Sequence, residues 1–277
     1  MENEEPRDPD LEPVEAIYDA LDYGDAETAL MLARRSLAEA GESGQDPVLH
    51  FLAGVALLEL DRPADAVVAL ELAVRLDPDD AEFHSRLAEA LFSCCRFDQA
   101  EHEARRAIAA DSRLPHGYWM IGLALERSGD YHAADNAVQK AADLSPDEFY
   151  VPVRMSREEF DQQLGTAIAS LPERFRAHLD DVTVAVEDLP SDELLLAEDP
   201  PLDPELLGLF VGAPCNERSV LSPGGELPAM IYLFQRNIER VSIDNEELRE
   251  EIAITLRHEL GHYLGLDEDE IARAGHA

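Results

Sequence analysis

Small and apolar residues recur every 34 positions in the first half of the chain, and this period constrains the fold more than any other feature. Four series keep the period: Gly54, Ala88 and Gly122; Ala66, Ala100 and Ala134; Ala73, Ala107 and Ala141; and Leu57, Leu91 and Leu125. A fixed period of this length is typical of helical hairpins that cannot bury their apolar face alone and therefore stack on their neighbours. The sequence predicts a solenoid with a concave face.

This pattern resembles the tetratricopeptide repeat, a pair of antiparallel helices in which small residues allow close packing. Three full copies and a weaker fourth copy are expected at 47–80, 81–114, 115–148 and near 10–43. The resemblance implies an all-α repeat domain over 13–149, preceded by an acidic disordered tail over 1–12. Such arrays commonly dock a peptide or protein partner on the concave face, and a rigid spacer is the alternative use.

A second domain is expected over 150–277, because the helical period ends after Pro146. Ser156 and Glu159 have the spacing of a capping box, which predicts a helix over 156–171. Short strands are expected at 182–186, 208–212 and 230–234, with an acidic, proline-rich loop or lid at 188–205 and a turn at Pro223-Gly224-Gly225.

The last long helix is expected to begin after Asp244 and to run to about Leu264, with Gly265 as its C-cap. The whole chain is therefore predicted to be α+β, with an all-α solenoid followed by a small α+β domain.

That last helix carries an H-E-x-x-H arrangement at His258-Glu259-Leu260-Gly261-His262. Residues four apart lie one turn apart on the same helical face, so both imidazoles can reach one metal ion. Zinc is the metal expected, because it binds neutral imidazole and a catalytic zinc site keeps one position open for water. The glutamate beside them can accept a proton from the metal-bound water.

A third metal ligand is expected just after this helix. Gly265 can adopt a positive φ and turn the chain back toward the metal, which brings Glu268 within reach. Metzincins have a histidine at that position. Asp267 or Asp269 would serve instead if the turn differs by one residue.

Residues 156–271 resemble the minimal zincin-like metallopeptidase family, whose motif is of the H-E-x-x-H-x-x-G-x-x-D type. The resemblance implies that His258 and His262 bind zinc and that Glu259 is the general base of a peptidase. The family's third ligand is usually Asp, whereas this chain has Glu268 at that position. The implied reaction is hydrolysis of a peptide bond by Glu-assisted attack of metal-bound water.

Two further expectations concern the substrate. The strand around 229–234 is expected to pair with an extended peptide by edge addition. Tyr232 and Tyr263 are candidates for stabilising the oxyanion, although a tyrosine at such a position is more often a core residue.

The charge balance indicates which partners to expect. Sixty acidic side chains and 22 basic ones give a formal net charge of −38. Such a charge repels phosphate backbones and anionic headgroups, so neither nucleic acid nor a membrane is expected as a partner, whereas divalent metals and basic peptides are attracted. Three cysteines provide no disulfide framework, the first residues are the reverse of a secretory signal, and no apolar run is long enough to span a membrane, so we expect a soluble cytoplasmic protein.

Two other hypotheses fit the same residues. The H-E-x-x-H segment also occurs in ordinary amphipathic helices whose histidines are core or surface residues. Alternatively, the chain is a non-catalytic adaptor whose zinc site is structural or vestigial. Glu259 favours the enzyme, because a structural zinc does not need a general base.

Overall fold

The computed structural model describes residues 13–40, 46–215, 229–267 and 270–271. The tail expected over 1–12 and the turn expected at Pro223-Gly224-Gly225 lie outside these residues. The chain divides into two compact units, one ending at Phe149 and the other beginning at Tyr150. No helix in the described ranges is long and apolar enough to cross a membrane.

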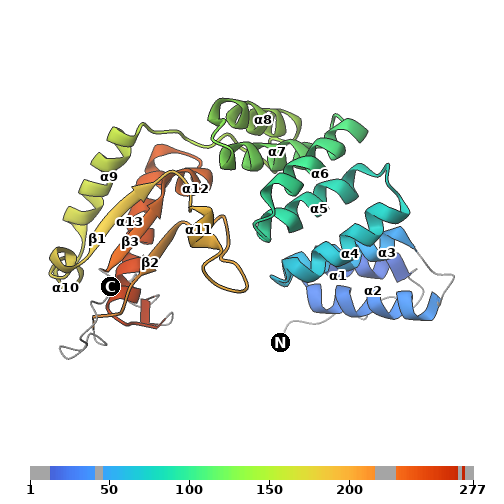
Figure 1. Ribbon diagram of the computed structural model, residues 1–277, viewed down its shortest axis with the longest axis horizontal. Helices are drawn as coiled ribbons and strands as arrows, with labels where there is room; N and C mark the ends of the chain where they lie inside the picture. Colours follow the sequence, from blue (N-terminus) through green and yellow to red (C-terminus); the bar gives the residue numbers. More distant parts are fainter. Residues whose placement is uncertain (1–12, 41–45, 216–228, 268–269, 272–277) are drawn as a thin grey trace. The chain divides into compact units, whose positions relative to one another are not determined.

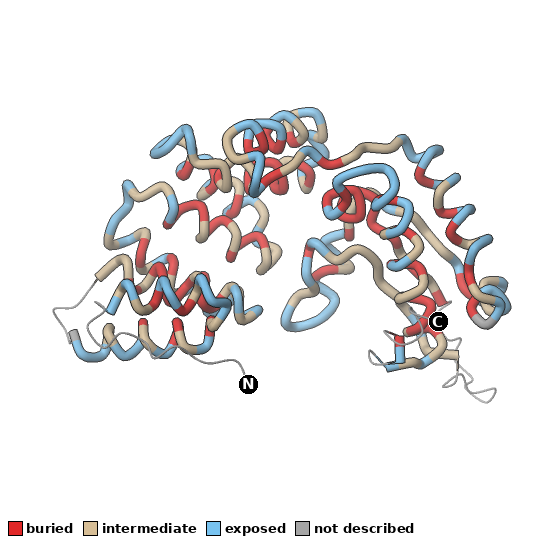
Figure 2. The backbone as a smooth tube through the Cα atoms, turned by 180° about the vertical axis from the view of Figure 1, so that it is seen from behind, coloured by how far each residue is buried: buried red, intermediate tan, exposed pale blue. Residues whose placement is uncertain are grey.

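The first unit is a stack of helical hairpins (Figure 1). The helices are α1 (Pro13–Asp22), α2 (Ala26–Ala40), α3 (Pro47–Glu59), α4 (Pro63–Leu76), α5 (Ala81–Ser93), α6 (Phe97–Ala110), α7 (Pro115–Arg127) and α8 (Tyr131–Leu144). Each helix packs against the next one along the chain. Buried residues, red in Figure 2, follow the sides of the helices that contact one another. The predicted all-α solenoid is confirmed.

The 34-residue period has a packing cause. A Cβ added to Gly54 of α3 would lie 2.5 Å from Cγ of Leu70 in α4, and one added to Gly122 of α7 would lie 2.6 Å from Cγ2 of Val138 in α8. The equivalent positions of the middle repeat hold Ala88 and Ala104, both fully buried. In these three hairpins the crossing point is filled either by a glycine and a branched residue or by two alanines.

The turns inside the hairpins share one backbone conformation. Gly24, Asp61, Cys95 and Gly129 have φ values of 72°, 53°, 57° and 79°, so all four are left-handed. The first hairpin, the weaker copy in the sequence, therefore closes like the others. Glycine adopts this conformation without a steric penalty, whereas Asp61 and Cys95 adopt it at a cost.

The second unit contains a three-stranded sheet in the order β1-β3-β2. Its elements are α9 (Arg157–Ser170), α10 (Glu173–Arg176), the 3-10 helix η2 (Leu179–Asp181), β1 (Thr183–Glu187), α11 (Asp192–Leu195), β2 (Gly208–Val211), β3 (Met230–Phe234), α12 (Gln235–Arg240) and α13 (Asn245–Tyr263). The helix, the strands and the last helix expected from the sequence are confirmed.

Strand β3 lies in the middle of the sheet. It pairs in parallel with β1, from Thr183 opposite Met230 onward, and antiparallel with β2, from Gly208 opposite Leu233 onward. Both of its edges are therefore occupied. The expectation that an extended substrate adds to the strand at 229–234 is wrong, because β1 and β2 already take its backbone hydrogen bonds.

Helix α13 packs against α9 and against strands β2 and β3 (Figure 1). One stripe of α13 enters the core at four-residue intervals, together with buried residues of α9 and β3; the stripe is Leu248, Ile252, Leu256 and Leu260. This stripe fixes the rotation of α13, and with it the direction of the H-E-x-x-H side chains.

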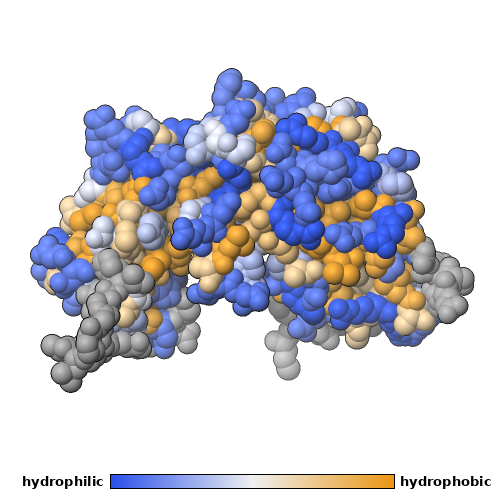
Figure 3. Space-filling view, in the orientation of Figure 1, coloured by the Kyte–Doolittle hydropathy of each residue, from blue (hydrophilic) through white to orange (hydrophobic). Residues whose placement is uncertain are grey.

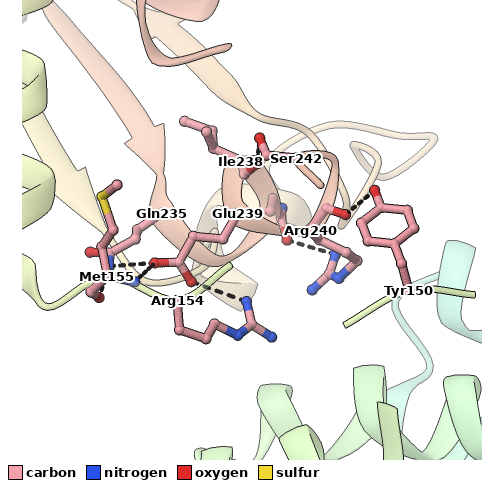
Figure 4. A network of polar contacts seen from close by, with 9 residues as sticks. Tyr150, Arg154, Met155, Gln235, Ile238, Glu239, Arg240 and Ser242 are labelled. Carbon is pink, nitrogen blue, oxygen red and sulfur yellow. Dashed lines mark hydrogen bonds and ion pairs between the residues drawn. The ribbon is translucent and has the colours of Figure 1, made fainter. Parts of the chain in front are cut away.

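Helix α12 joins β3 to the segment before α13, and it is both polar and buried (Figure 4). The carboxylate of Glu239 accepts hydrogen bonds from the guanidinium of Arg154 at 3.0 Å, the backbone N–H of Met155 at 3.0 Å and the side-chain amide of Gln235 at 2.8 Å. The hydroxyl of Tyr150 donates to the carbonyl of Arg240 at 2.6 Å. The first residues of the unit thus anchor α12.

The loop expected at 188–205 is also tied to α12. The side-chain amide of Asn237 donates to the carbonyls of Pro204 and Leu206 at 3.0 and 2.8 Å. The guanidinium of Arg240 lies 3.2 Å from the carboxylate of Glu205. These contacts hold the chain where it enters β2.

Candidate metal and catalytic site

Local sequence places the site helix. Asp244 caps the N-terminus of α13, since its carboxylate accepts hydrogen bonds from the backbone of Glu246 and Glu247 at 2.7 and 3.0 Å. An N-cap of this kind satisfies backbone donors that have no partner within the helix. The end of α13 that carries the H-E-x-x-H segment lies four turns further on.

His258 and His262 converge. Their Nε2 atoms are 3.0 Å apart, and their ring centroids are 4.7 Å apart with planes at 79°. Nitrogens this close are within hydrogen-bonding distance of each other, and one hydrogen at most lies between them. Two nitrogens bound to a tetrahedral zinc at about 2.0–2.1 Å lie about 3.3 Å apart. The observed separation therefore suits a shared metal ion.

Glu259 faces the sheet instead of the solvent. It is 6% exposed and lies on the helix stripe that faces β2. A Cβ added to Gly208, the first residue of β2, would lie 2.7 Å from Cγ2 of Thr255, 2.9 Å from Cγ of Glu259 and 3.1 Å from Oε1 of Glu259. The absence of a side chain at Gly208 thus leaves the space that the Glu259 carboxylate occupies.

The chain reverses direction directly after α13. Gly265 has φ of 74° and its N–H donates to the carbonyl of His262 at 2.9 Å, while the N–H of Leu266 donates to the carbonyl of Gly261 at 3.1 Å. This pair of bonds is a Schellman motif. Ile271 then returns to the helix, because a Cβ added to Gly261 would lie 2.5 Å from its Cγ1.

Asp267 caps a further helical turn after α13. Its carboxylate accepts a hydrogen bond from the N–H of Glu270 at 2.8 Å, and the carboxylate of Glu270 accepts one from the N–H of Asp267 at 3.1 Å. This is a capping box, and the D-x-x-E spacing was the signal for it. The proposed third ligand Glu268 and the alternative Asp269 lie outside the described residues. Within those residues, no group of three or more metal-ligating side chains gathers.

The two tyrosines considered for the oxyanion have other surroundings. Tyr263 is 1% exposed and its ring meets Phe210 and His178 edge-on, at centroid distances of 5.8 and 6.1 Å. The Tyr232 hydroxyl contacts the sulfur of Met230 at 3.5 Å. Tyr263 is therefore a core residue.

His84 of the repeats stabilises the packing of two helices. His84 is buried in α5, with Nδ1 2.6 Å from the Glu103 carboxylate and Nε2 2.9 Å from the carbonyl of Pro78. Burial alone would raise the pKa of Glu103, but the hydrogen bond and charge of His84, with smaller contributions from Arg106 and His102, hold it below its ordinary value. This pair ties α5 to α6.

Family models match parts of both units. Residues 179–276 match a family model described as zincin-like metallopeptidase, and residues 57–116 and 115–148 match two models of the tetratricopeptide repeat. A crystal structure of MamA is 20% identical with a TM-score of 0.41, over 58% of this chain and 86% of that one. MamA 41-end from Desulfovibrio magneticus RS-1 is 21% identical with a TM-score of 0.41, over 57% and 83%. No curated protein sequence matches this chain.

Proposed function

Because the chain is a tetratricopeptide repeat array fused to a zincin-like metallopeptidase domain, we propose that it is a zinc-dependent peptidase whose repeats dock a protein partner or substrate. The observation that carries this proposal is the convergence of the His258 and His262 Nε2 atoms to 3.0 Å beside the buried Glu259. In the proposal, Glu268 completes the ligand set.

Zinc at this site would polarise a peptide carbonyl as a Lewis acid and lower the pKa of the attacking water to near 7. Glu259 accepts the proton of that water as it attacks the carbonyl, and then donates it to the leaving amine. Enclosure against Gly208 holds the Glu259 carboxylate in one orientation, which a general base needs in order to act. Free rotation of that carboxylate would weaken both steps.

The sheet suggests where the substrate lies. Since both edges of β3 are occupied, a peptide that extends the sheet has to join β1 or β2. Strand β2 begins at Gly208, which contacts Glu259, so a peptide along β2 would pass close to the proposed base. Backbone pairing of this kind supplies affinity with little sequence preference.

The test measures zinc content and cleavage of an unstructured protein such as casein. The wild-type chain is expected to bind about one zinc and to cleave casein, Glu259→Gln to keep the zinc and lose cleavage, and His262→Ala to lose both. Glu250→Gln is the matched control, because Glu250 is an exposed carboxylate on the same helix. It is expected to behave as wild type.

Two outcomes would contradict the peptidase. If zinc is bound but neither the wild type nor the control variant cleaves any unstructured protein, the chain is an adaptor with a structural or vestigial site. If Glu259→Gln cleaves casein as fast as wild type, Glu259 is not the general base, and the cleavage comes from another residue or from a contaminating protease.

A further inference from the structure

The inner helices of the repeat unit enclose a cavity of about 410 Å³. Its walls come from the first helix of each of four successive hairpins, with Tyr18 on α1, Phe51 on α3, Glu82 on α5 and His116 on α7 among them. A volume of this size is at the lower end of what ligand pockets provide, and it suits one or two side chains of a bound segment.

The floor of the cavity is apolar. Phe51 is buried and stacks on Phe83 at a centroid distance of 4.8 Å, and Leu52 and Val55 of the same helix also line the cavity. Tyr18 is 45% exposed at its edge. An apolar side chain that entered here would lose its contact with water and gain packing against these groups.

The rim is acidic. Four carboxylates line the cavity, those of Asp22, Glu59, Glu82 and Glu148, against the single guanidinium of Arg86. That guanidinium already lies 2.8 Å from the carboxylate of Glu89, which is outside the lining. On the face seen in Figure 3, hydrophilic residues (blue) lie beside apolar ones (orange) over the repeat unit.

The histidine of the lining adds no positive charge near neutral pH. Burial lowers the pKa of His116 to about 4, with the charge of Glu89 opposing the shift and that of Arg86 adding to it. Its Nδ1 lies 2.7 Å from the hydroxyl of Ser85. Burial also raises the pKa of Glu59, with the charge of Arg86 lowering it and that of Glu89 raising it. The negative charge of the rim is thus only partly compensated within the protein.

We propose that this cavity takes an extended peptide segment in which an arginine or lysine side chain is next to an apolar one. The apolar side chain fills the floor and the cation is bound by the carboxylates of Glu59 and Glu82. Hydrogen bonds between a cationic side chain and a carboxylate are about twice as strong as those between neutral groups. The inference rests on the docking role proposed for the repeats, and it specifies the chemistry of what they dock.

The test uses the full chain with Glu259→Gln, so that bound peptide is not cut. The probes are three fluorescein-labelled peptides, built from repeats of Gly-Arg-Leu, Gly-Arg-Ser and Gly-Glu-Leu, and binding is followed by fluorescence anisotropy. The Gly-Arg-Leu peptide is expected to bind at least about tenfold more tightly than either of the others, because only it supplies both the charge and the apolar side chain.

The site is assigned by paired substitutions. Glu59→Gln with Glu82→Gln is expected to weaken binding of the Gly-Arg-Leu peptide about tenfold. Glu27→Gln with Glu39→Gln removes the same charge from exposed positions of α2 and is expected to leave binding unchanged.

Three results would overturn the proposal: no binding of the Gly-Arg-Leu peptide, equal binding of Gly-Arg-Ser, or equal losses in the two charge variants. The last two would show that net charge alone attracts the peptide. The peptidase proposal can fail independently of this one, because casein cleavage is measured with the wild type and peptide binding with the Glu259→Gln variant.

Discussion

Gly54 and Leu70 fill one crossing point between α3 and α4, and their coupling can be measured. Changing Gly54→Ala would place a methyl carbon 2.5 and 2.7 Å from Cγ and Cδ2 of Leu70. Packed carbon atoms lie about 3.5–4.0 Å apart, so the methyl is about 1 Å too close. Overpacking of this kind costs about 1–3 kcal/mol. Leu70→Ala removes a fully buried side chain at a cost of about 2–5 kcal/mol.

The double variant should be more stable than the two single changes predict. With Leu70 shortened, the new methyl has no clash and fills part of the cavity, as two alanines do at Ala88 and Ala104 of the middle repeat. We expect a coupling free energy of at least about 1 kcal/mol between the two changes. The same cycle at Gly122 and Val138 should give the same sign.

Urea unfolding of the full chain can follow this unit selectively. The chain has one tryptophan, Trp119 on α7, and its ring lies 5.3 Å from that of Phe149 within the repeat unit. Its fluorescence therefore reports unfolding of the repeats. Additivity of the two changes within about 0.5 kcal/mol would refute the close-packing explanation of the 34-residue period.

Four further substitutions have defined outcomes. Cys95→Gly should raise the unfolding free energy of the repeats by about 0.5–1 kcal/mol and Gly129→Ala should lower it by about 1 kcal/mol, since both positions have positive φ; equal signs in urea titrations would contradict this. Glu103→Gln should cost about 1–3 kcal/mol at neutral pH. The folded pKa of Glu103 lies below its ordinary value of 4.5, so this stabilisation is complete above pH 4.5 and is lost as the pH falls through the folded pKa. The unfolding temperatures of the variant and the wild type should therefore converge in acid. Gly208→Ala should lower kcat/KM for casein about 10–100-fold with zinc content unchanged, because the new methyl clashes with Thr255 and with the Glu259 side chain and so displaces the Glu259 carboxylate; an unchanged kcat/KM would contradict this reasoning.

The repeats and the site helix could be predicted because their signals are local. A period of 34 residues and the i, i+4 spacing of His258 and His262 each follow from the geometry of a helix. Once the helix forms, the i, i+4 spacing alone brings the two imidazoles together. The φ of Gly265 was likewise predictable, because a glycine after the last helical turn is a common way to end a helix.

What the sequence did not reveal depends on contacts between distant segments. The central place of β3 follows from pairing with strands that begin at Thr183 and Gly208, and short apolar runs do not indicate their neighbours. The burial of α12 was unexpected because its sequence is polar, and its partners lie about 80 residues earlier in the chain. The contact of Gly208 with Glu259 is of the same kind. The capping box at Asp267 could have been predicted, because Glu270 follows it at the D-x-x-E spacing.

The contacts of α12 also determine how the second unit can be excised. The matched family region begins at residue 179, yet the groups that hydrogen-bond Glu239 include Arg154 and Met155. A fragment that begins at 179 would bury the Glu239 carboxylate without two of its hydrogen-bond donors, which costs several kcal/mol. It would also expose the side of α13 that α9 covers. An isolated second unit therefore has to start no later than Tyr150, and insolubility of a shorter fragment would not test the proposed peptidase activity.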